Sequence, residues 1–394
     1  MRGAARARFA GALWASGFRP FFLLGALYGL LALGAGLGGY VGLGALSPAA
    51  GRAALWHGHE MVFGFAAAII SGLLLTALPS WAGVHEIRGG ELAALVLAWL
   101  AGRVAMWVAP SLSPLLAAAA DLALLLLVTA ALAPDLLAVR QRKFAVVLPV
   151  LLALAGADVA FHAAQLGADA VQATRALDAA VAVIAVLFAL VGGFMTPVFT
   201  RSALPASAAF AVRRRRGVER AAHLTIVAFA VTVALPTPAA LAGATALAAC
   251  LAHALRLAGW RGWSVRKSAL VLSMHVAYAW LVVALALRAG AELGAPIAPR
   301  AWVHAATVGA FGTMMLSLMP RVALRHTGRA LALHPAMRAA LVAVSAAAVL
   351  RLGASTLGWG AWAIVAALGL WSFCFVAYLV LYAPLLLRPS LPRA

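Results

Sequence analysis

Charged residues are scarce in this chain, and their scarcity excludes most soluble folds. They make up 10% of the 394 residues, whereas about a quarter of an average soluble domain is charged. Acidic residues number only 10 against 30 lysines and arginines, and 65% of the chain is hydrophobic. Such a composition cannot cover a water-exposed surface, so it predicts an integral membrane protein.

Cysteine is equally scarce, which excludes several kinds of cofactor site. Cys250 and Cys374 are the two cysteines, and neither belongs to a C-x-x-C or C-x-x-C-H motif. Covalent haem attachment and a cysteine zinc site are therefore not expected. A soluble flavin or nicotinamide domain is also missing from the sequence, so any electrons that the protein uses must come from outside the chain.

Long apolar runs dominate what is present. A helix needs about 20 apolar residues to cross a bilayer, and proline, glycine and arginine cut this chain into runs of about that length. We expect an all-α, polytopic membrane bundle that forms a single integral membrane domain over residues 1–394. The twelve expected helices cover residues 20–45, 56–79, 90–109, 112–133, 144–166, 176–198, 220–236, 238–257, 268–289, 301–320, 337–353 and 358–387.

The basic residues indicate how these helices are oriented. If the N-terminus is cytoplasmic, few basic residues fall outside, which is the positive-inside signature. Both termini are then expected in the cytoplasm. The net charge of +20, including the run Arg213–Arg216, is explained by anionic lipids of the inner leaflet, and no nucleic-acid partner is expected. The basic residues expected outside are Arg52, Arg175, Arg288, Arg300 and Arg351, while Arg103 falls within a span.

Ionisable side chains within the predicted spans are the candidates for function. Inserting one costs about 2.5 to 3.5 kcal/mol, and such residues mark pathways or cofactor sites. Apart from two in loops, the 10 histidines fall into two layers. The outer layer, predicted to bind a metal or haem, holds His57, His59, His162 and His304. The inner layer holds His223, His253, His275 and His326.

Two histidines of the inner layer are predicted to have a function, unlike the inner histidines that lie near aqueous loops. His253 and His275 lie away from aqueous loops, so a second cofactor or a proton entry site is expected there. In the outer layer, His57 and His59 are two residues apart and point about 160° apart on a regular helix. One metal cannot use both unless the helix starts irregularly, and the sequence leaves open which one is the ligand.

Three charged residues accompany the outer histidines. Asp158 stands four residues before His162 and is predicted to orient that imidazole. Arg103 is expected within reach of Glu60 or of an anionic propionate. We assign Glu60, Asp158 and Arg103 as candidate catalytic residues that handle protons or charge.

Six blocks of the sequence together resemble the NnrS family. They occur in the family's order from about Arg19 to Arg329. Departures lie at Pro320, at Arg325, and after Gly193, where "GGF" replaces an expected "GGR". The blocks are "FRPFF", "WHGHEMVFGFAAAIISGLLLTALPSWAG", "WLAGR", "GGFMTPVFTR", "MHVAYAWL" and "HAATVGAFGTMMLSLMPRVALRHTGR".

The resemblance implies a multi-pass protein of the bacterial inner membrane that binds haem, copper or both and protects against nitric oxide. Imidazole suits a b-type haem and copper alike. Nitric oxide, small and neutral, reaches a buried metal through lipid, while its reduction would draw electrons from quinol or a redox partner. Whether the protein is an enzyme stays open. The alternatives are a twelve-helix transporter and a haem-based sensor or cofactor chaperone without turnover.

Overall fold

The structure, a computed structural model, describes residues 11–40, 52–139 and 144–392. It is all-helical, with 82% of residues in helices and no strand among those it describes. Twelve helical segments within these ranges are long and apolar enough to cross a membrane. The predicted fold class and number of spans are confirmed, and the chain is a multi-pass membrane protein.

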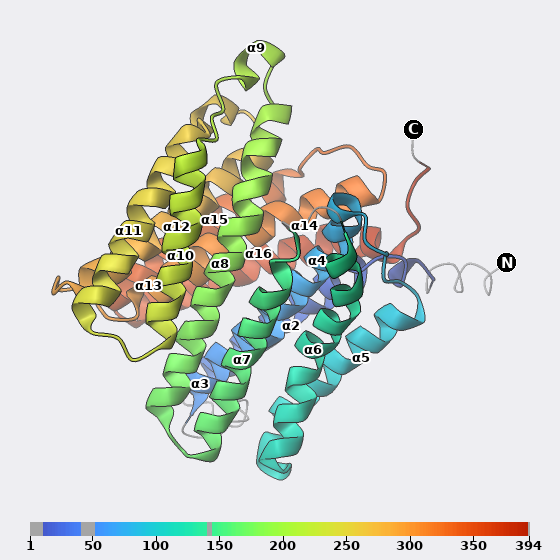
Figure 1. Cartoon of the computed structure of the whole chain (residues 1–394). Coiled ribbons are helices and arrows are strands. Elements are labelled where there is room, and N and C mark those ends of the chain that lie inside the picture. Colours follow the sequence, from blue (N-terminus) through green and yellow to red (C-terminus); the bar gives the residue numbers. More distant parts are fainter. Residues whose placement is uncertain (1–10, 41–51, 140–143, 393–394) are drawn as a thin grey trace. The chain divides into compact units, whose positions relative to one another are not determined.

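The first six spans run through the N-terminal half of the chain (Figure 1). The predicted end of the first span, residues 41–45, lies outside the described residues. The second span is continuous although three segments compose it: α3, η2 and α4. The bounds are α2 Phe18–Tyr40, α3 Ala53–His59, η2 Glu60–Ala66, α4 Ala67–Ala82, α5 Gly90–Trp107, α6 Pro114–Ala138, α7 Val147–Leu166 and α8 Ala170–Ser202.

The other six spans follow after the short helix α9, Ala206–Ala209. Pro236 and Pro238 separate α10 from α11, as predicted. The tenth span is built from α13, η6 and α14. The bounds are α10 Arg216–Ala234, α11 Ala239–Gly259, α12 Ala269–Glu292, α13 Ala301–His304, η6 Ala305–Gly312, α14 Thr313–His326, α15 Pro335–Thr356 and α16 Ala361–Leu387.

Two helices extend well beyond the predicted bounds. Helix α8 begins at Ala170 because Asp169 Oδ1 accepts from the backbone N–H groups of Val171 and Gln172, at 3.0 and 2.9 Å. This is a helix N-cap. Helix α14 continues through Pro320 to His326, where the prediction ended at the proline. Membrane helices tolerate an internal proline when neighbouring groups satisfy the freed backbone.

Two π-helical segments interrupt the second and tenth spans. Each begins directly after a histidine: η2 follows His59, and η6 follows His304. A π-helix adds a residue to the turn and rotates the side chains that follow it, and such segments are frequent at functional sites. Both histidines had been selected from sequence for their depth alone.

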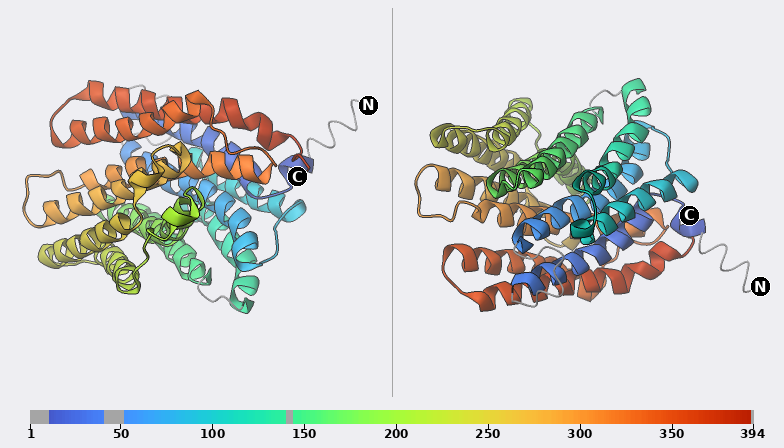
Figure 2. Two further views of the ribbon diagram at one scale, coloured as in Figure 1. Left: turned by 90° about the horizontal axis from the view of Figure 1, so that it is seen from above. Right: turned by 90° about the horizontal axis from the view of Figure 1, so that it is seen from below.

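Contacts divide the chain into two compact units. Unit 1 comprises residues 1–180, 322–331 and 378–394, and unit 2 comprises 181–321 and 332–377. Within unit 1, α5 packs on α6 and α6 packs on α7; within unit 2, α10, α11 and α12 lie side by side (Figures 1 and 2). The single domain expected from sequence stays a prediction.

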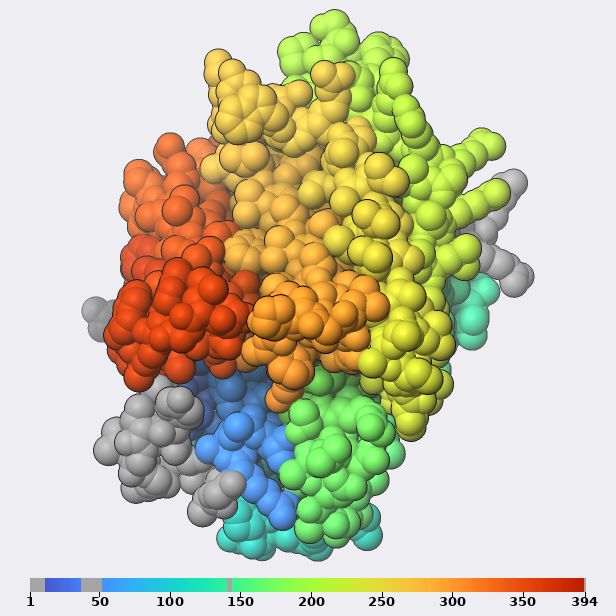
Figure 3. Space-filling model, turned by 90° about the vertical axis from the view of Figure 1, so that its left-hand side faces the viewer, coloured from blue at the N-terminus to red at the C-terminus, as the bar shows by residue number. Residues whose placement is uncertain are grey.

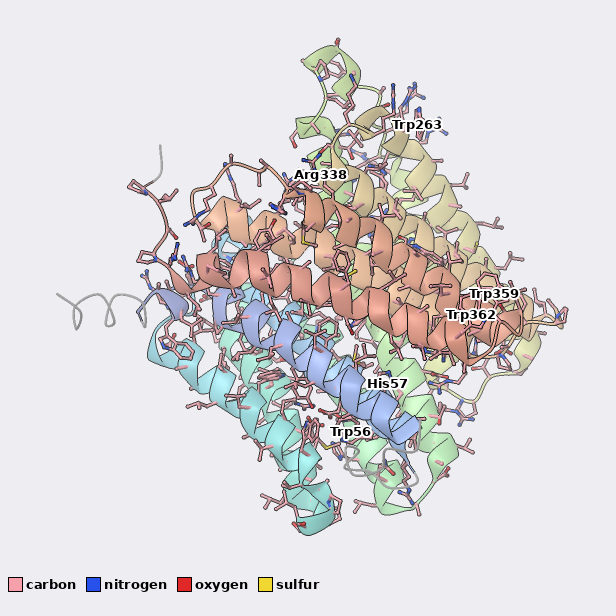
Figure 4. The ribbon with its side chains drawn as sticks, turned by 180° about the vertical axis from the view of Figure 1, so that it is seen from behind. Trp56, His57, Trp263, Arg338, Trp359 and Trp362 are labelled. Carbon is pink, nitrogen blue, oxygen red and sulfur yellow. The ribbon has the colours of Figure 1, made fainter. Side chains whose placement is uncertain are left out.

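Helix α11, drawn in yellow, lies at the surface of unit 2 (Figure 3) and exposes apolar side chains. Leu247, Leu251 and Leu255 recur every four residues and are 42%, 57% and 64% exposed. At the ends of α15, Figure 4 shows Arg338 near the start and Trp359 beyond the far end, where its ring stacks on Trp362. Apolar flanks with basic and aromatic ends are typical of helices in lipid.

Candidate functional site

Unit 1 contains a cluster of six polar side chains on four spans. It consists of His59, Glu60, Arg103, Asp121, Asp158 and His162, which we call the histidine–carboxylate cluster. Five of these residues are buried, and the His162 side chain is 11% exposed. The first two come from the second span, and the others come from α5, α6 and α7. So many ionisable groups away from water need one another, or a ligand, for compensation.

Four side-chain atoms converge at the centre of this cluster. His59 Nε2 lies 2.9 Å from Asp121 Oδ2 and 3.1 Å from Asp158 Oδ1. His162 Nε2 lies 3.0 Å from the same Asp121 oxygen and 3.6 Å from the same Asp158 oxygen. One ligand atom from each of the four residues lies within 4.8 Å of the others, so the four residues could hold a metal ion.

Glu60 and Arg103 surround this centre on one side. Arg103 Nη1 donates to Glu60 Oε2 over 2.7 Å, and Arg103 Nη2 also pairs with Asp121 Oδ1. The other Glu60 oxygen lies 2.8 Å from His59 Nδ1. The Arg103 guanidinium thus holds two carboxylates that each contact a histidine.

Tyr28 completes this side of the cluster from α2. Its hydroxyl accepts from Trp107 Nε1 over 3.0 Å and therefore directs its own hydrogen to Glu60 Oε2. Glu60 accepts from Tyr28, Arg103 and His59, and such a set of donors stabilises an ionised carboxylate.

Two glycines let the helices approach closely enough to form the cluster. A Cβ at Gly64 would lie 2.6 Å from Tyr28 Cε1 and 3.0 Å from Arg103 Nη1. A Cβ at Gly102 would lie 3.0 Å from the backbone of Asp121. Any larger residue would push α5 away from α6, or Tyr28 and Arg103 away from η2.

Several predicted site residues do lie together. Glu60 reaches Arg103, as expected. Asp158 is beside His162, yet its oxygen is closer to His59, and the carboxylate nearest to His162 is Asp121. Asp158 is thus a neighbour of His162, as expected, but Asp121 is closer to the ring, and the orienting role of Asp158 stays a prediction.

The other two predicted outer histidines are placed elsewhere. His57 is half-buried and packs against α2, where a Cβ at Gly36 would lie 2.7 Å from its Nδ1 (Figure 4). His304 belongs to unit 2. Neither residue is in the four-residue group. His57 and His59 were expected to point in opposite directions. This is consistent with the structure, in which His59 lies in the cluster and His57 lies against α2.

A model of the NnrS protein family matches residues 12–390, nearly the whole chain. The chain belongs to the NnrS family. A search of curated proteins found no match. Membership suggests a protein of the nitric oxide response.

Asp121 and Tyr28 are the two residues of this NnrS protein that sequence reasoning missed as site residues. Asp121 falls within the predicted span 112–133, but it was not selected as a site residue. Tyr28 stands in the apolar first helix and carries no charge. The energetic cost of placing Asp121 inside the membrane indicated that it needs a partner. That cost does not show which neighbouring helix supplies the partner, which is Arg103 of α5.

Haem does not fit the centre of the cluster. Both ring nitrogens of His59 face carboxylate oxygens, at 2.8, 2.9 and 3.1 Å. The ring also lies between Phe63 and Phe161, with centroids 4.9 and 4.5 Å away. A haem ligated by His59 Nε2 would need the place that Asp121 and Asp158 occupy. A single ion with nitrogen and oxygen ligands fits instead, and copper(II) is within that class.

Unit 2 of the NnrS protein has its own polar network, around Arg256 on α11. Arg256 pairs with Glu219, at 3.0 and 2.8 Å, and donates to Tyr278 and to the Ala189 carbonyl. His253 lies 3.1 Å from the Ala222 carbonyl and 2.6 Å from the Tyr278 hydroxyl. Because the Ala222 carbonyl can only accept a hydrogen bond, His253 Nε2 carries the hydrogen and donates to it, and Nδ1 accepts from the Tyr278 hydroxyl. Both nitrogens of His253 are thus engaged, which disfavours the predicted ligand role.

His275 differs from His253 in keeping one nitrogen without a partner. Thr200 donates its hydroxyl hydrogen to the Thr196 carbonyl over 2.7 Å, so it can only accept from His275 Nε2, 2.8 Å away. His275 Nδ1 is buried and has no hydrogen-bond partner among the described residues. This nitrogen lies close to Gly262, where a Cβ would be 2.6 Å away from it. The predicted inner pair is on consecutive helices, but only His275 retains a ligand atom.

Proposed function

We propose that this NnrS protein acts in nitric oxide resistance by binding nitric oxide, or another small neutral ligand, at a metal centre in the histidine–carboxylate cluster. The observation that carries the proposal is the convergence of His59, Asp121, Asp158 and His162 on one point in a protein of this family. The proposed location is the bacterial inner membrane.

Burial of the cluster supports a neutral ligand. His59, Glu60, Asp121 and Asp158 are all buried, so a charged substrate would lose its hydration on entry without a matching charge. Nitric oxide has little hydration to lose and can arrive through lipid. A metal ion would supply the electrophilic centre to which it binds.

Reduction of nitric oxide would also require protons and electrons. Glu60 and Asp158 would carry protons at the cluster, and Arg103 would hold Glu60 in position. Electrons would come from a quinol or a redox partner. The family resemblance also implies haem or copper, and our proposal includes such a cofactor. If it is haem, it would bind outside the histidine–carboxylate cluster.

A complementation experiment tests the role. Cells that lack the chromosomal copy would express the wild type, H59Q, H162Q or the control H85Q, whose histidine is exposed in a loop. After a dose of nitric oxide donor, we expect the wild type and H85Q to shorten the growth lag equally, and H59Q and H162Q to lose most of this protection. Equal protection by all four proteins, at equal abundance in the membrane, would refute the proposal.

A further inference from the structure

The histidine–carboxylate cluster has the arrangement of a non-haem metal site. We infer that His59, Asp121, Asp158 and His162 bind one divalent ion of the iron, manganese or zinc class directly, through two imidazole nitrogens and two carboxylate groups. The inference deepens the proposed function, on which it rests for its biological role. The binding of the ion is nevertheless a separate property that can be measured without nitric oxide.

The spacing of the four atoms is the first argument. Ligands about 2.1 Å from one ion lie about 3.0 Å apart at right angles and about 3.4 Å apart at tetrahedral angles. The four histidine–carboxylate separations are 2.9, 3.1, 3.0 and 3.6 Å. They match pairs of ligands around a shared ion, and nitrogen and oxygen donors suit these divalent metals.

Charge is the second argument. Glu60, Asp121 and Asp158 carry three negative charges when ionised, and Arg103 is the guanidinium that pairs with this cluster. Two negative charges are left over inside the unit. Uncompensated charges are very costly in a low-dielectric interior. A divalent cation at the centre brings the cluster to neutrality.

A second arrangement would also balance the charge: protons on both His59 and His162. It would supply donors to Asp121 Oδ2 and Asp158 Oδ1 but none to the remaining oxygen of Asp158. That oxygen is buried without a hydrogen-bond partner among the described residues, and Asp158 itself is 0% exposed. A metal ion, or a water bound to it, accounts for this oxygen as well.

The groups around the four ligands are the third argument. Metal-bound histidines almost always donate their other ring N–H to a carboxylate or carbonyl, which fixes the tautomer and the ring direction. His59 Nδ1 lies 2.8 Å from Glu60 Oε1. Arg103 in turn holds both Glu60 and the ligand Asp121. Glu60 is thus a positioning residue for His59.

The binding test uses cobalt(II) as the probe. The full-length protein would be purified in detergent, stripped with a chelator and titrated with Co²⁺ in wild-type, H162Q and D158E forms. H85Q is the matched control, because His85 is also an imidazole beside a carboxylate but is exposed. We expect one Co²⁺ per chain with a ligand-field spectrum in the wild type and H85Q. Loss of even an outer partner of a metal ligand costs about 10- to 100-fold in affinity, so H162Q, which loses a ligand, should bind at least about tenfold more weakly, and D158E should bind with a shifted spectrum.

H162Q is the decisive variant because His162 is the most exposed member of the cluster, and its ion pairs are with Asp121 and Asp158 rather than with Glu60 or Arg103. If it fails to fold, nitrogen hyperfine coupling to Mn²⁺ bound to the wild type decides, and two histidine nitrogens are expected. No stoichiometric binding by the wild type, no nitrogen coupling, or equal affinity and spectrum in H162Q would overturn the inference.

The outcomes also separate the site from its role. Stoichiometric binding that H162Q abolishes, combined with full nitric oxide protection by H162Q in cells, would leave the metal site in place and refute the proposed function. Absence of metal binding, combined with loss of protection in H59Q and H162Q, would overturn the metal site, while the cluster itself would still be required for nitric oxide resistance.

Discussion

Arg103 of α5 donates from Nη1 to Glu60 Oε2 of η2 over 2.7 Å, and both side chains are buried. The same guanidinium pairs with Asp121 of α6. Arg103 thereby ties three spans together at the point where four potential metal ligands meet. Loss of Arg103 would therefore affect both the stability of unit 1 and the geometry of the cluster.

Replacing Arg103 with Met should destabilise the protein strongly. The change leaves the Glu60 and Asp121 carboxylates without their cation, and removal of one partner from a buried ion pair costs about 3 to 5 kcal/mol. Thermal unfolding in detergent should show a large fall in the midpoint. The control is Arg52→Met, because Arg52 is exposed and its guanidinium donates to the Gln165 side chain at the surface. A midpoint for R103M equal to that of R52M would contradict the prediction.

Replacing Tyr28 with Phe should have a smaller but measurable effect. Glu60 loses one donor and Trp107 loses its acceptor, and an unsatisfied buried group costs about 1 to 3 kcal/mol. Tyr378→Phe is a matched control: Tyr378 is buried, as Tyr28 is, but its hydroxyl has no hydrogen-bond partner in the described part of the chain. Unfolding midpoints should fall for Y28F and stay within error for Y378F. The reverse order would show that Tyr28 does not support Glu60.

The twelve spans could be predicted from sequence because each one is set by local apolar length and by the residues that end it. Pro236 and Pro238, for example, fix the break between α10 and α11 within the chain itself. The contact between Glu60 and Arg103 was also within reach, since opposite charges at one depth attract. Asp121 was not, because its partner depends on which face of α6 meets α5, and apolar residues on every side hide that face.

The direction of each histidine was equally hidden in the sequence. Depth in the membrane grouped His57, His59, His162 and His304, but the helix rotation decides which rings meet. The π-helix that begins at Glu60 alters that rotation. No hydrophobic period in the sequence marks a π-helix. Only the structure could therefore show that the four-residue group contains Asp121 and Asp158 and not His57 and His304.

Replacing Gly193 with Ala should destabilise unit 2. A Cβ at this position would overlap the guanidinium of Arg256, which is held in place by Glu219 and Tyr278. Overpacking of a filled interior costs about 1 to 3 kcal/mol. Gly156→Ala is the control, since a Cβ there meets nothing within 4 Å and alanine favours the helix by up to about 1 kcal/mol. We expect G193A to unfold at a lower temperature than the wild type and G156A at an equal or higher one; equal midpoints would contradict the contact.

The orientation of the helices gives a prediction that needs no cofactor. Because basic residues concentrate in alternate connections, reporters fused after Ala394 or inserted between Arg213 and Arg220 should both report the cytoplasm. An insertion next to Arg300, in the α12–α13 connection, should report the opposite side. A non-cytoplasmic signal at either of the first two sites, in protein of full length, would contradict the orientation derived from charge.

The last prediction distinguishes a haem site from the divalent metal site by asking which imidazole nitrogens are free to bind a metal. Haem does not fit at His59, whose two nitrogens face carboxylates, whereas His275 keeps a buried Nδ1 lone pair because Thr200 fixes the hydrogen on Nε2. If the protein purified from haem-replete cells shows a b-type haem spectrum, H275A should lose or shift one component of it, while H59Q should retain the spectrum and lose the divalent ion. His253 offers a matched control, since both of its nitrogens are engaged; H253Q should therefore keep the haem spectrum. Loss of haem in H59Q with an unchanged spectrum in H275A would show that haem occupies unit 1 and that the lone pair of His275 has no part in binding it.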